Sequence, residues 1–181
     1  FPLVRLVVLF SLATGLLHEV AMGPYAGKET GEPALLREMF ERLKAGDVLV
    51  ADRCYCGWFL IALLQELGVD MVVRLHQMRE ADFQQGERLG KGDHLVEWPR
   101  PPKPDWMDAA AYARMPASLR LREVQVQVAE RGFRVQSLVV VTTLLDSTIY
   151  PADELATLYR RRWLVELDVR TIKSTLKLDV L

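Results

Sequence analysis

The chain has 181 residues, of which 50% are hydrophobic, 8% aromatic and 26% charged. This length and composition fit one globular domain, or a core with an insertion, that buries a sizeable apolar surface. The formal net charge is −1, which excludes a protein that binds nucleic acid through overall basicity. Locally, however, basic residues gather near the C-terminus, whereas acidic residues lie largely upstream. The basic cluster consists of Arg160, Arg161, Arg162, Arg170, Lys173 and Lys177.

The cysteines and the N-terminal apolar stretch argue against a zinc site and a membrane span. Cys54 and Cys56 are the only cysteines, and a Cys-x-Cys pair without suitably spaced partners cannot build a four-ligand zinc site. We therefore expect two buried thiols in a reducing cytosol. Residues 3–17 are apolar but too short and too interrupted to cross a bilayer, and no signal peptide is visible. The histidines show no ligand spacing and are expected to be structural or on the surface: His18, His76 and His94.

Both ends of the chain suggest a fragment. Phe1 stands where an initiator methionine would be, and a strand pattern begins within three residues. At the other end, Leu181 follows a helical pattern without any capping signal. We therefore expect a segment that is cut at both ends.

The first part of the chain has an α/β pattern. Residues 4–11 and 16–24 read as strands joined by an "ATG" turn, which predicts an antiparallel hairpin. Two helices, each closed by a glycine, then alternate with two short apolar strands. A hairpin followed by helix, strand, helix and strand predicts helices packed on a mixed sheet. The expected ranges are a helix at 34–46, a strand at 47–52, a helix at 57–68 and a strand at 70–76.

The middle of the chain differs in composition from the first part. It is polar and rich in proline, and its second half alternates apolar and polar residues at 123–128, which predicts a half-exposed hairpin or small sheet. A buried strand follows at 137–146, and Pro151 fits the first turn of a last helix. We thus expect a β-rich insertion just before the last helix. The resulting division is 1–76 as the first part of the core, 77–136 as the insertion and 137–181 as the end of the core.

The last helix places two stripes side by side. At about 100° per residue, an apolar stripe indicates the buried face. It consists of Leu158, Val165, Val169, Ile172 and Leu176. A polar stripe with Trp163 at its margin borders it, and consists of Tyr159, Arg162, Glu166, Arg170, Lys173 and Lys177. Spacing alone also fits a solvated face in which Glu166 forms i,i+4 ion pairs with Arg162 and Arg170.

Asp52 is the best-placed acidic residue of the chain. It ends a buried strand, and in open α/β sheets ligands gather at the carboxyl ends of strands. It could instead cap the next segment or pair with Arg53. Together with Glu166, however, it would give two carboxylates among cations, as two-metal phosphoryl transfer requires. That hypothesis needs the two carboxylates to lie about 4 to 6 Å apart around shared ions.

These residues carry a family resemblance. Tyr159, Arg162, Glu166 and Lys173 reproduce the spacing of the Y-R-E-K signature of transposases of the insertion-sequence 4 (IS4) family. "LVADRCYCGW" resembles the segment with the second Asp of that family. The connecting stretches "GPYAGKETGE", "VDMVVRLHQMR" and "VVVTTLLD" are similar as well, so the resemblance spans nearly the whole chain.

The resemblance implies an α/β fold of the RNase H-like (retroviral-integrase) type with a D-D-E triad that binds two Mg²⁺ ions, with Mn²⁺ as a substitute. By motif, Asp52 and Glu166 would be catalytic metal ligands. The implied DNA contacts are Tyr159, Arg162, Trp163, Arg170 and Lys173. The implied partners are the terminal inverted repeats and target DNA, bound by a homodimer in a synaptic complex, in the cytoplasm at the nucleoid and not at a membrane.

The first Asp of the family's triad has no counterpart in this sequence. In the family it lies on a strand before the hairpin with which this chain begins. Glu19 falls on the wrong strand, and Asp47 starts a strand instead of ending one. We therefore expect the fragment alone to be inactive. Two other interpretations stay open: a non-catalytic nucleic-acid-binding remnant on the same fold, and a globular protein whose last helix pairs its charges in solvent.

Overall fold

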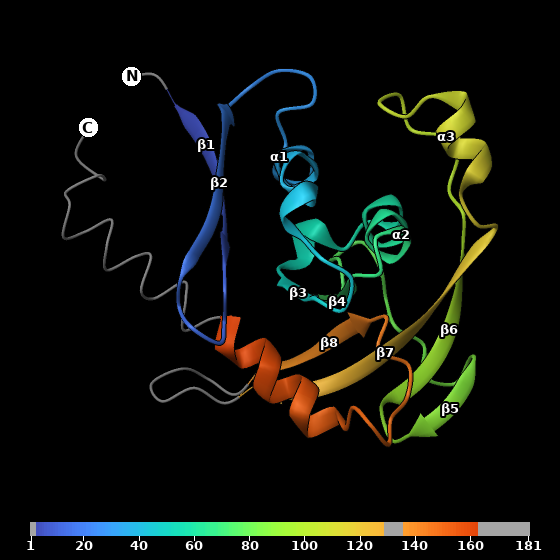
Figure 1. Cartoon of the computed structure of the whole chain (residues 1–181). Helices are drawn as coiled ribbons and strands as arrows, with labels where there is room; N and C mark the ends of the chain where they lie inside the picture. The colour runs from blue at the N-terminus through green and yellow to red at the C-terminus, as the bar shows by residue number, and fades with distance from the viewer. Residues whose placement is uncertain (1–2, 129–135, 163–181) are drawn as a thin grey trace.

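The described part of the chain contains two β-sheets, which Figure 1 shows together with the helices. The computed structural model describes residues 3–128 and 136–162. A two-stranded sheet has the order β1-β2, and a six-stranded sheet has the order β3-β4-β8-β7-β6-β5. No helix in these ranges is long and apolar enough to cross a membrane.

The N-terminal hairpin forms as the sequence predicts. β1 (Val4–Phe10) and β2 (Leu17–Pro24) pair antiparallel. Gly15 closes the turn with a φ of 70°, a conformation that glycine adopts without steric cost. The hairpin packs on the rest of the molecule through Val7 and Ala21, which are buried.

The α/β segment after the hairpin also follows the predicted order. Its two strands pair in parallel, with a helix as the crossover between them. The elements are α1 (Glu32–Glu38), η1 (Phe40–Arg42), β3 (Val48–Ala51), η2 (Arg53–Tyr55), α2 (Trp58–Glu66) and β4 (Asp70–Arg74).

The helix predicted at 34–46 is wrong in its length. The α-helix ends at Glu38, and Met39, with φ −95° and ψ 3°, starts a 3-10 turn. Met39, Leu35 and Leu36 are all buried, so tertiary packing of this short helix outweighs the helical periodicity that continues in the sequence.

The strands of the predicted insertion continue the core sheet. They are β5 (Glu87–Gly90), β6 (Asp93–Pro99) and β7 (Ser118–Val128), with α3 (Ala109–Arg114) between the last two. β8 (Gln136–Thr142) then pairs with β7 on one side and with β4 on the other, antiparallel to both. This mixed α/β architecture, with β-rich segments before the last helix, agrees with the RNase H-like fold class that the sequence predicts.

The alternation on β7 has one exception to its predicted pattern. Val124 and Val126 are buried and Gln125 is exposed, as expected. Glu123, however, is buried: it accepts a hydrogen bond of 3.0 Å from Trp98 Nε1, and His94 Nε2 lies 3.0 Å from its other oxygen. His94 is therefore a structural residue in a buried polar network.

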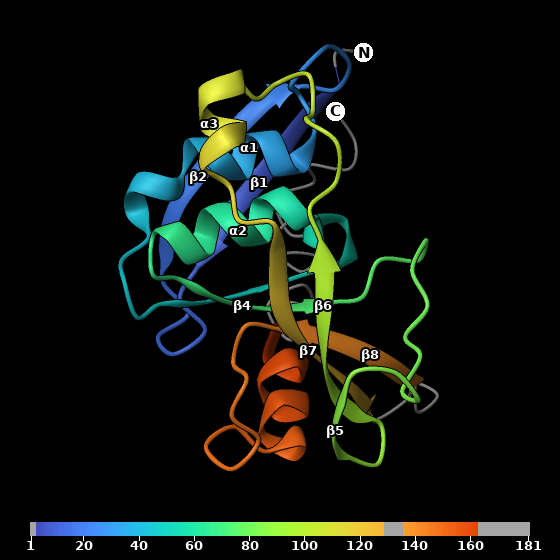
Figure 2. The same cartoon turned by 90° about the vertical axis from the view of Figure 1, so that its right-hand side faces the viewer.

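The helix at 152–162 covers the second face of the sheet, as Figures 1 and 2 show in orange and red. Leu155 and Tyr159 pack there with a buried cluster of strand residues. The chain enters this helix through a segment that is tied to the sheet, because the buried Arg122 on β7 donates a hydrogen bond of 2.7 Å to the Tyr150 carbonyl. Arg122 also forms a two-pronged ion pair with Asp93, at 2.8 and 2.6 Å.

Candidate functional site around Asp52

Asp52 lies at the carboxyl end of β3, where the sequence predicts it. The strand ends at Ala51, and the Asp52 carbonyl accepts a hydrogen bond of 3.0 Å from the Tyr55 amide, which starts a tight 3-10 turn. The Asp52 side chain is 40% exposed, so its carboxylate is fixed by the strand end and still open to a ligand.

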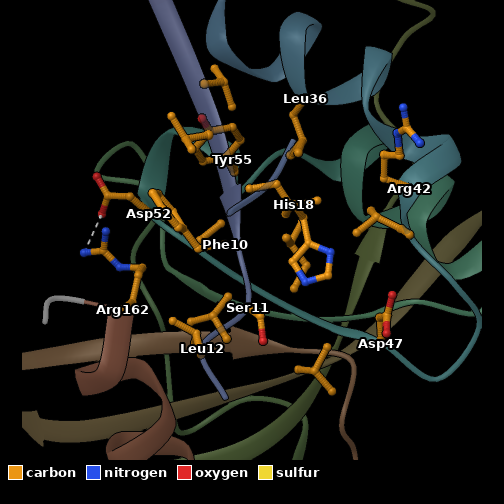
Figure 3. Close-up of a pocket in the computed structure, with 18 of the residues that line it drawn as sticks. Phe10, Ser11, Leu12, His18, Leu36, Arg42, Asp47, Asp52, Tyr55 and Arg162 are labelled. Carbon is orange, nitrogen blue, oxygen red and sulfur yellow. Dashed lines mark ion pairs between the residues drawn. The ribbon is translucent and has the colours of Figure 1, made fainter. Parts of the chain in front are cut away.

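Two residues of the polar stripe meet Asp52 from the helix at 152–162. The Tyr159 hydroxyl donates a long hydrogen bond of 3.5 Å to Asp52 Oδ1, and Arg162 Nη2 lies 3.9 Å from the same oxygen. Figure 3 shows the Arg162 guanidinium pointing at Asp52. The Arg162 Cζ also lies 5.1 Å from the centre of the Tyr159 ring. The fold thus brings together one carboxylate, one phenol and one guanidinium from distant parts of the chain.

The Tyr159 side chain is fully buried, and its protonation state follows from that. Burial raises the pKa of its hydroxyl to about 12, and the Asp52 charge acts in the same direction, while Arg162 and Arg74 lower it. The hydroxyl therefore remains a neutral donor at physiological pH. As a neutral donor, the hydroxyl can form a hydrogen bond with an anionic oxygen without repelling it.

An open cavity of ≈ 1380 Å³ lies beside Asp52. One part of its wall is the run 6–13 of β1 and its turn, and another is the run 47–52 of β3, with Arg162 and Tyr55 at the Asp52 end. Within the described residues, β1 pairs only with β2, and β3 pairs only with β4. Both strands therefore have a backbone edge without a strand partner, and these edges border the same cavity.

Comparison with known proteins places this chain in a family. The family model described as "Transposase DDE domain" matches residues 1–181. The chain belongs to the DDE transposase family. It is also 25% identical over 177 residues to "Transposase InsG for insertion sequence element IS4" of Escherichia coli (strain K12). This match covers 98% of the chain and 37% of InsG, so the chain spans little more than a third of that relative. The predicted resemblance to IS4-family transposases is confirmed.

DDE transposases act on DNA and generally use divalent metal ions, and one described residue fits such an ion. The carboxylate oxygens of Asp52 are hard ligands of the kind Mg²⁺ prefers, and they face an open cavity. Within residues 3–128 and 136–162, no group of three His, Cys, Asp or Glu side chains could hold a metal ion. The described residues thus offer one ligand and not a complete set.

Four residues of the predicted site lie outside the described ranges: Trp163, Glu166, Arg170 and Lys173. The hypothesis that Glu166 converges with Asp52 around shared ions therefore remains a prediction. The same holds for the stacking role of Trp163 and for the phosphate contacts of Arg170 and Lys173.

Cys54 and Glu32 also line the cavity beside Asp52, and the sequence predicted neither as a site residue. The Cys54 thiol donates a hydrogen bond of 3.2 Å to Glu32 Oε2, which ties the start of α1 to the turn after Asp52. Of the two cysteines, Cys56 is buried as expected, but Cys54 is exposed, so the expectation of two buried thiols is wrong. Cys54 directly follows the site residues in a tight turn, which places it at the cavity surface.

The reactivity of Cys54 gives a test of this wall. The pKa of the Cys54 thiol is raised to about 12, most of all by partial burial and also by the hydrogen bond and charge of Glu32. The thiolate fraction, and with it the alkylation rate, should climb steadily between pH 7 and pH 10 without levelling off. Glu32→Gln removes two of the raising effects, so its alkylation at pH 8 should be faster, by about tenfold for each unit by which the pKa falls.

Iodoacetamide alkylation of Cys54, followed by mass spectrometry, measures these rates. Cys56 is an internal reference, because it is buried and its pKa is also raised, to about 11. Glu38→Gln is the matched control, since it removes the same charge from an exposed position at the other end of α1. Equal rates for Glu32→Gln and wild type would contradict the described contact.

Proposed function

We propose that this chain is part of the catalytic domain of a DNA transposase that cleaves and joins strands at insertion-sequence ends. The observation that carries the proposal is the meeting of Asp52 with Tyr159 and Arg162 at the carboxyl end of β3. Tyr159 and Arg162 are the first two residues of the Y-R-E-K spacing. Their contact with the strand-end carboxylate supports a shared site more strongly than the spacing alone.

Each residue has a role in this proposal. Asp52 and Glu166 would hold two Mg²⁺ ions, for which Mn²⁺ could substitute. When bound, such ions activate a water and stabilise the leaving oxygen of the scissile phosphate. Tyr159 and Arg162 donate hydrogen bonds to backbone phosphates at the transposon end. Further along the chain, Arg170 and Lys173 contact phosphates, and Trp163 stacks on a displaced base.

The cavity beside Asp52 supports the proposal that the chain alone is inactive. We infer that a strand of the longer protein enters between the open edges of β1 and β3 and carries the first Asp of the triad. Both edges present unpaired backbone donors and acceptors to such a strand. Without it, one metal ligand is missing.

The longer protein would bind the terminal inverted repeats and the target DNA as a homodimer in a synaptic complex. This requirement follows from chemistry at two transposon ends. We place the protein in the cytoplasm, associated with the nucleoid through DNA.

A second function has its own support. The described residues offer a single carboxylate beside a guanidinium and a neutral phenol, a set that could bind phosphate without cutting it. On this alternative the chain is a non-catalytic nucleic-acid-binding remnant.

Binding to duplex DNA tests the phosphate role that both functions share. The chain should bind a fluorescein-labelled duplex at low salt, and Arg162→Ala should reduce the slope of log K against log[salt] by about one phosphate contact, or about 0.9. Arg161→Ala is the matched control, because Arg161 is the preceding, exposed residue of the same helix. Fluorescence anisotropy between 50 and 200 mM NaCl measures the slope. Absence of DNA binding by the wild-type chain would refute both functions.

A further inference from the structure

Arg74 ends β4 directly beside the Asp52 site. β3 and β4 are parallel, and their register pairs Ala51 with Val73. The next residue on each strand is therefore Asp52 on one side and Arg74 on the other. Neighbouring strands lie about 4.7–4.9 Å apart, so the two backbones bring this carboxylate and this guanidinium to the same edge.

The side chain of Arg74 also lies on the face that carries the site. Side chains alternate along a strand, and Val72, two residues earlier, packs in the buried cluster that contains Tyr159. By the same alternation Asp52 shares its face with Val50, which packs against that cluster as well. Arg74 and Asp52 thus both lie under the helix at 152–162.

The charge of Arg74 acts on the Tyr159 hydroxyl. Both Arg74 and Arg162 act on it and lower its pKa against the larger effect of burial. Arg74 is half-buried, yet within residues 3–128 and 136–162 no hydrogen bond or ion pair reaches its guanidinium. A half-buried guanidinium keeps five N–H donors that need acceptors.

We infer that Arg74 binds a backbone phosphate of DNA beside Asp52, opposite the phosphate contact of Arg162. Guanidinium groups suit this task because their planar fork binds phosphate oxygens in pairs. The two arginines come from different elements, one from the end of a strand and one from the helix, and the charge of each lowers the pKa of the Tyr159 hydroxyl. A strand of DNA that passes the Asp52 carboxylate would be held on both sides. This inference rests on the proposed function and adds a contact that lies outside the Y-R-E-K spacing.

The test compares the salt dependence of DNA binding between variants of the whole chain, with the labelled duplex as the probe. Arg74→Ala should lower the slope of log K against log[salt] by about 0.9 and weaken binding at 50 mM NaCl by about tenfold. Arg74→Lys should keep most of the slope, because the charge remains. Arg88→Ala is the matched control: Arg88 lies on β5, at the opposite end of the sheet from β3, and its loss should leave the slope unchanged.

The possible outcomes separate this inference from the proposed function. If the wild-type chain binds DNA and Arg74→Ala has the wild-type slope, Arg74 is only a structural residue and the inference is overturned, while the proposed function stands. If the wild-type chain binds no DNA, both are overturned. Arg74→Met provides a folding check, since it keeps the aliphatic stem and removes the charge. A wild-type slope for a folded Arg74→Met also overturns the inference.

Discussion

Asp52→Asn is expected to reduce DNA cleavage by about 10³-fold in a transposase that contains this chain together with the first Asp of the triad. Asparagine has the shape of aspartate but lacks the charge that holds a metal ion, and such an ion supplies several kcal/mol of transition-state stabilisation. DNA binding should fall little, because Tyr159 and Arg162 remain. Glu166→Gln should behave in the same way. Cleavage of an end-labelled duplex in the presence of MgCl₂ measures the rate.

Asp47→Asn is the matched control for this prediction. Asp47 lines the same cavity at the opposite end of β3, where its carboxylate accepts a hydrogen bond of 2.8 Å from the Lys44 amide. The same change there should leave the cleavage rate within about twofold, since the carboxylate is remote from the phosphate. Cleavage by Asp52→Asn at the wild-type rate would remove Asp52 from the catalytic site.

Arg122→Leu is expected to lower the free energy of unfolding by about 3–5 kcal/mol. Arg122 is fully buried and forms a two-pronged ion pair with Asp93, which is also buried. Removing the guanidinium leaves the Asp93 carboxylate buried without its donor, and the Tyr150 carbonyl loses its side-chain partner. The cost is that of an uncompensated charge, which exceeds the net worth of the pair itself.

Urea unfolding followed by circular dichroism measures this loss. Arg120→Leu is the matched control, because Arg120 lies on the same strand and pairs with Glu87 in an exposed position. Its loss should cost at most about 1 kcal/mol. In the double variant Asp93→Leu and Arg122→Leu, much of the stability should return, because no charge is left buried. A single Arg122→Leu variant as stable as Arg120→Leu would contradict the described ion pair.

The parts of the fold that local pattern determines could be predicted from the sequence. Apolar runs bounded by glycines predict the hairpin, β3, α2 and β4, because the glycines mark where each element ends. The length of α1 could not be predicted, because packing of Met39 ends it against a helical pattern. The burial of Glu123 was missed for a related reason: its partners His94 and Trp98 lie on another strand.

The candidate site shows the same division between local and non-local information. Asp52 could be predicted from its place after a buried strand, and Tyr159 and Arg162 from their spacing on a helix. The contacts of Tyr159 and Arg162 with Asp52 join segments that are far apart in the chain, so they could be found only from the structure. The place of Arg74 beside Asp52 could not be predicted from the sequence, because it depends on the register between β3 and β4.

The place of β8 in the sheet has a consequence for how the protein is made. β4 pairs with β8, and Val72 of β4 lies opposite Thr142 of β8. β4 therefore cannot complete its pairing until the ribosome has synthesised the residues up to β8. During that time one edge of β4 is open to other chains, and open edges promote aggregation. The antiparallel neighbours β6 and β7 can pair first, because they are separated by a shorter stretch of chain. The free edge of β7 can then pair with β8. β6 and β7 would thus act as a template on which the sheet is completed.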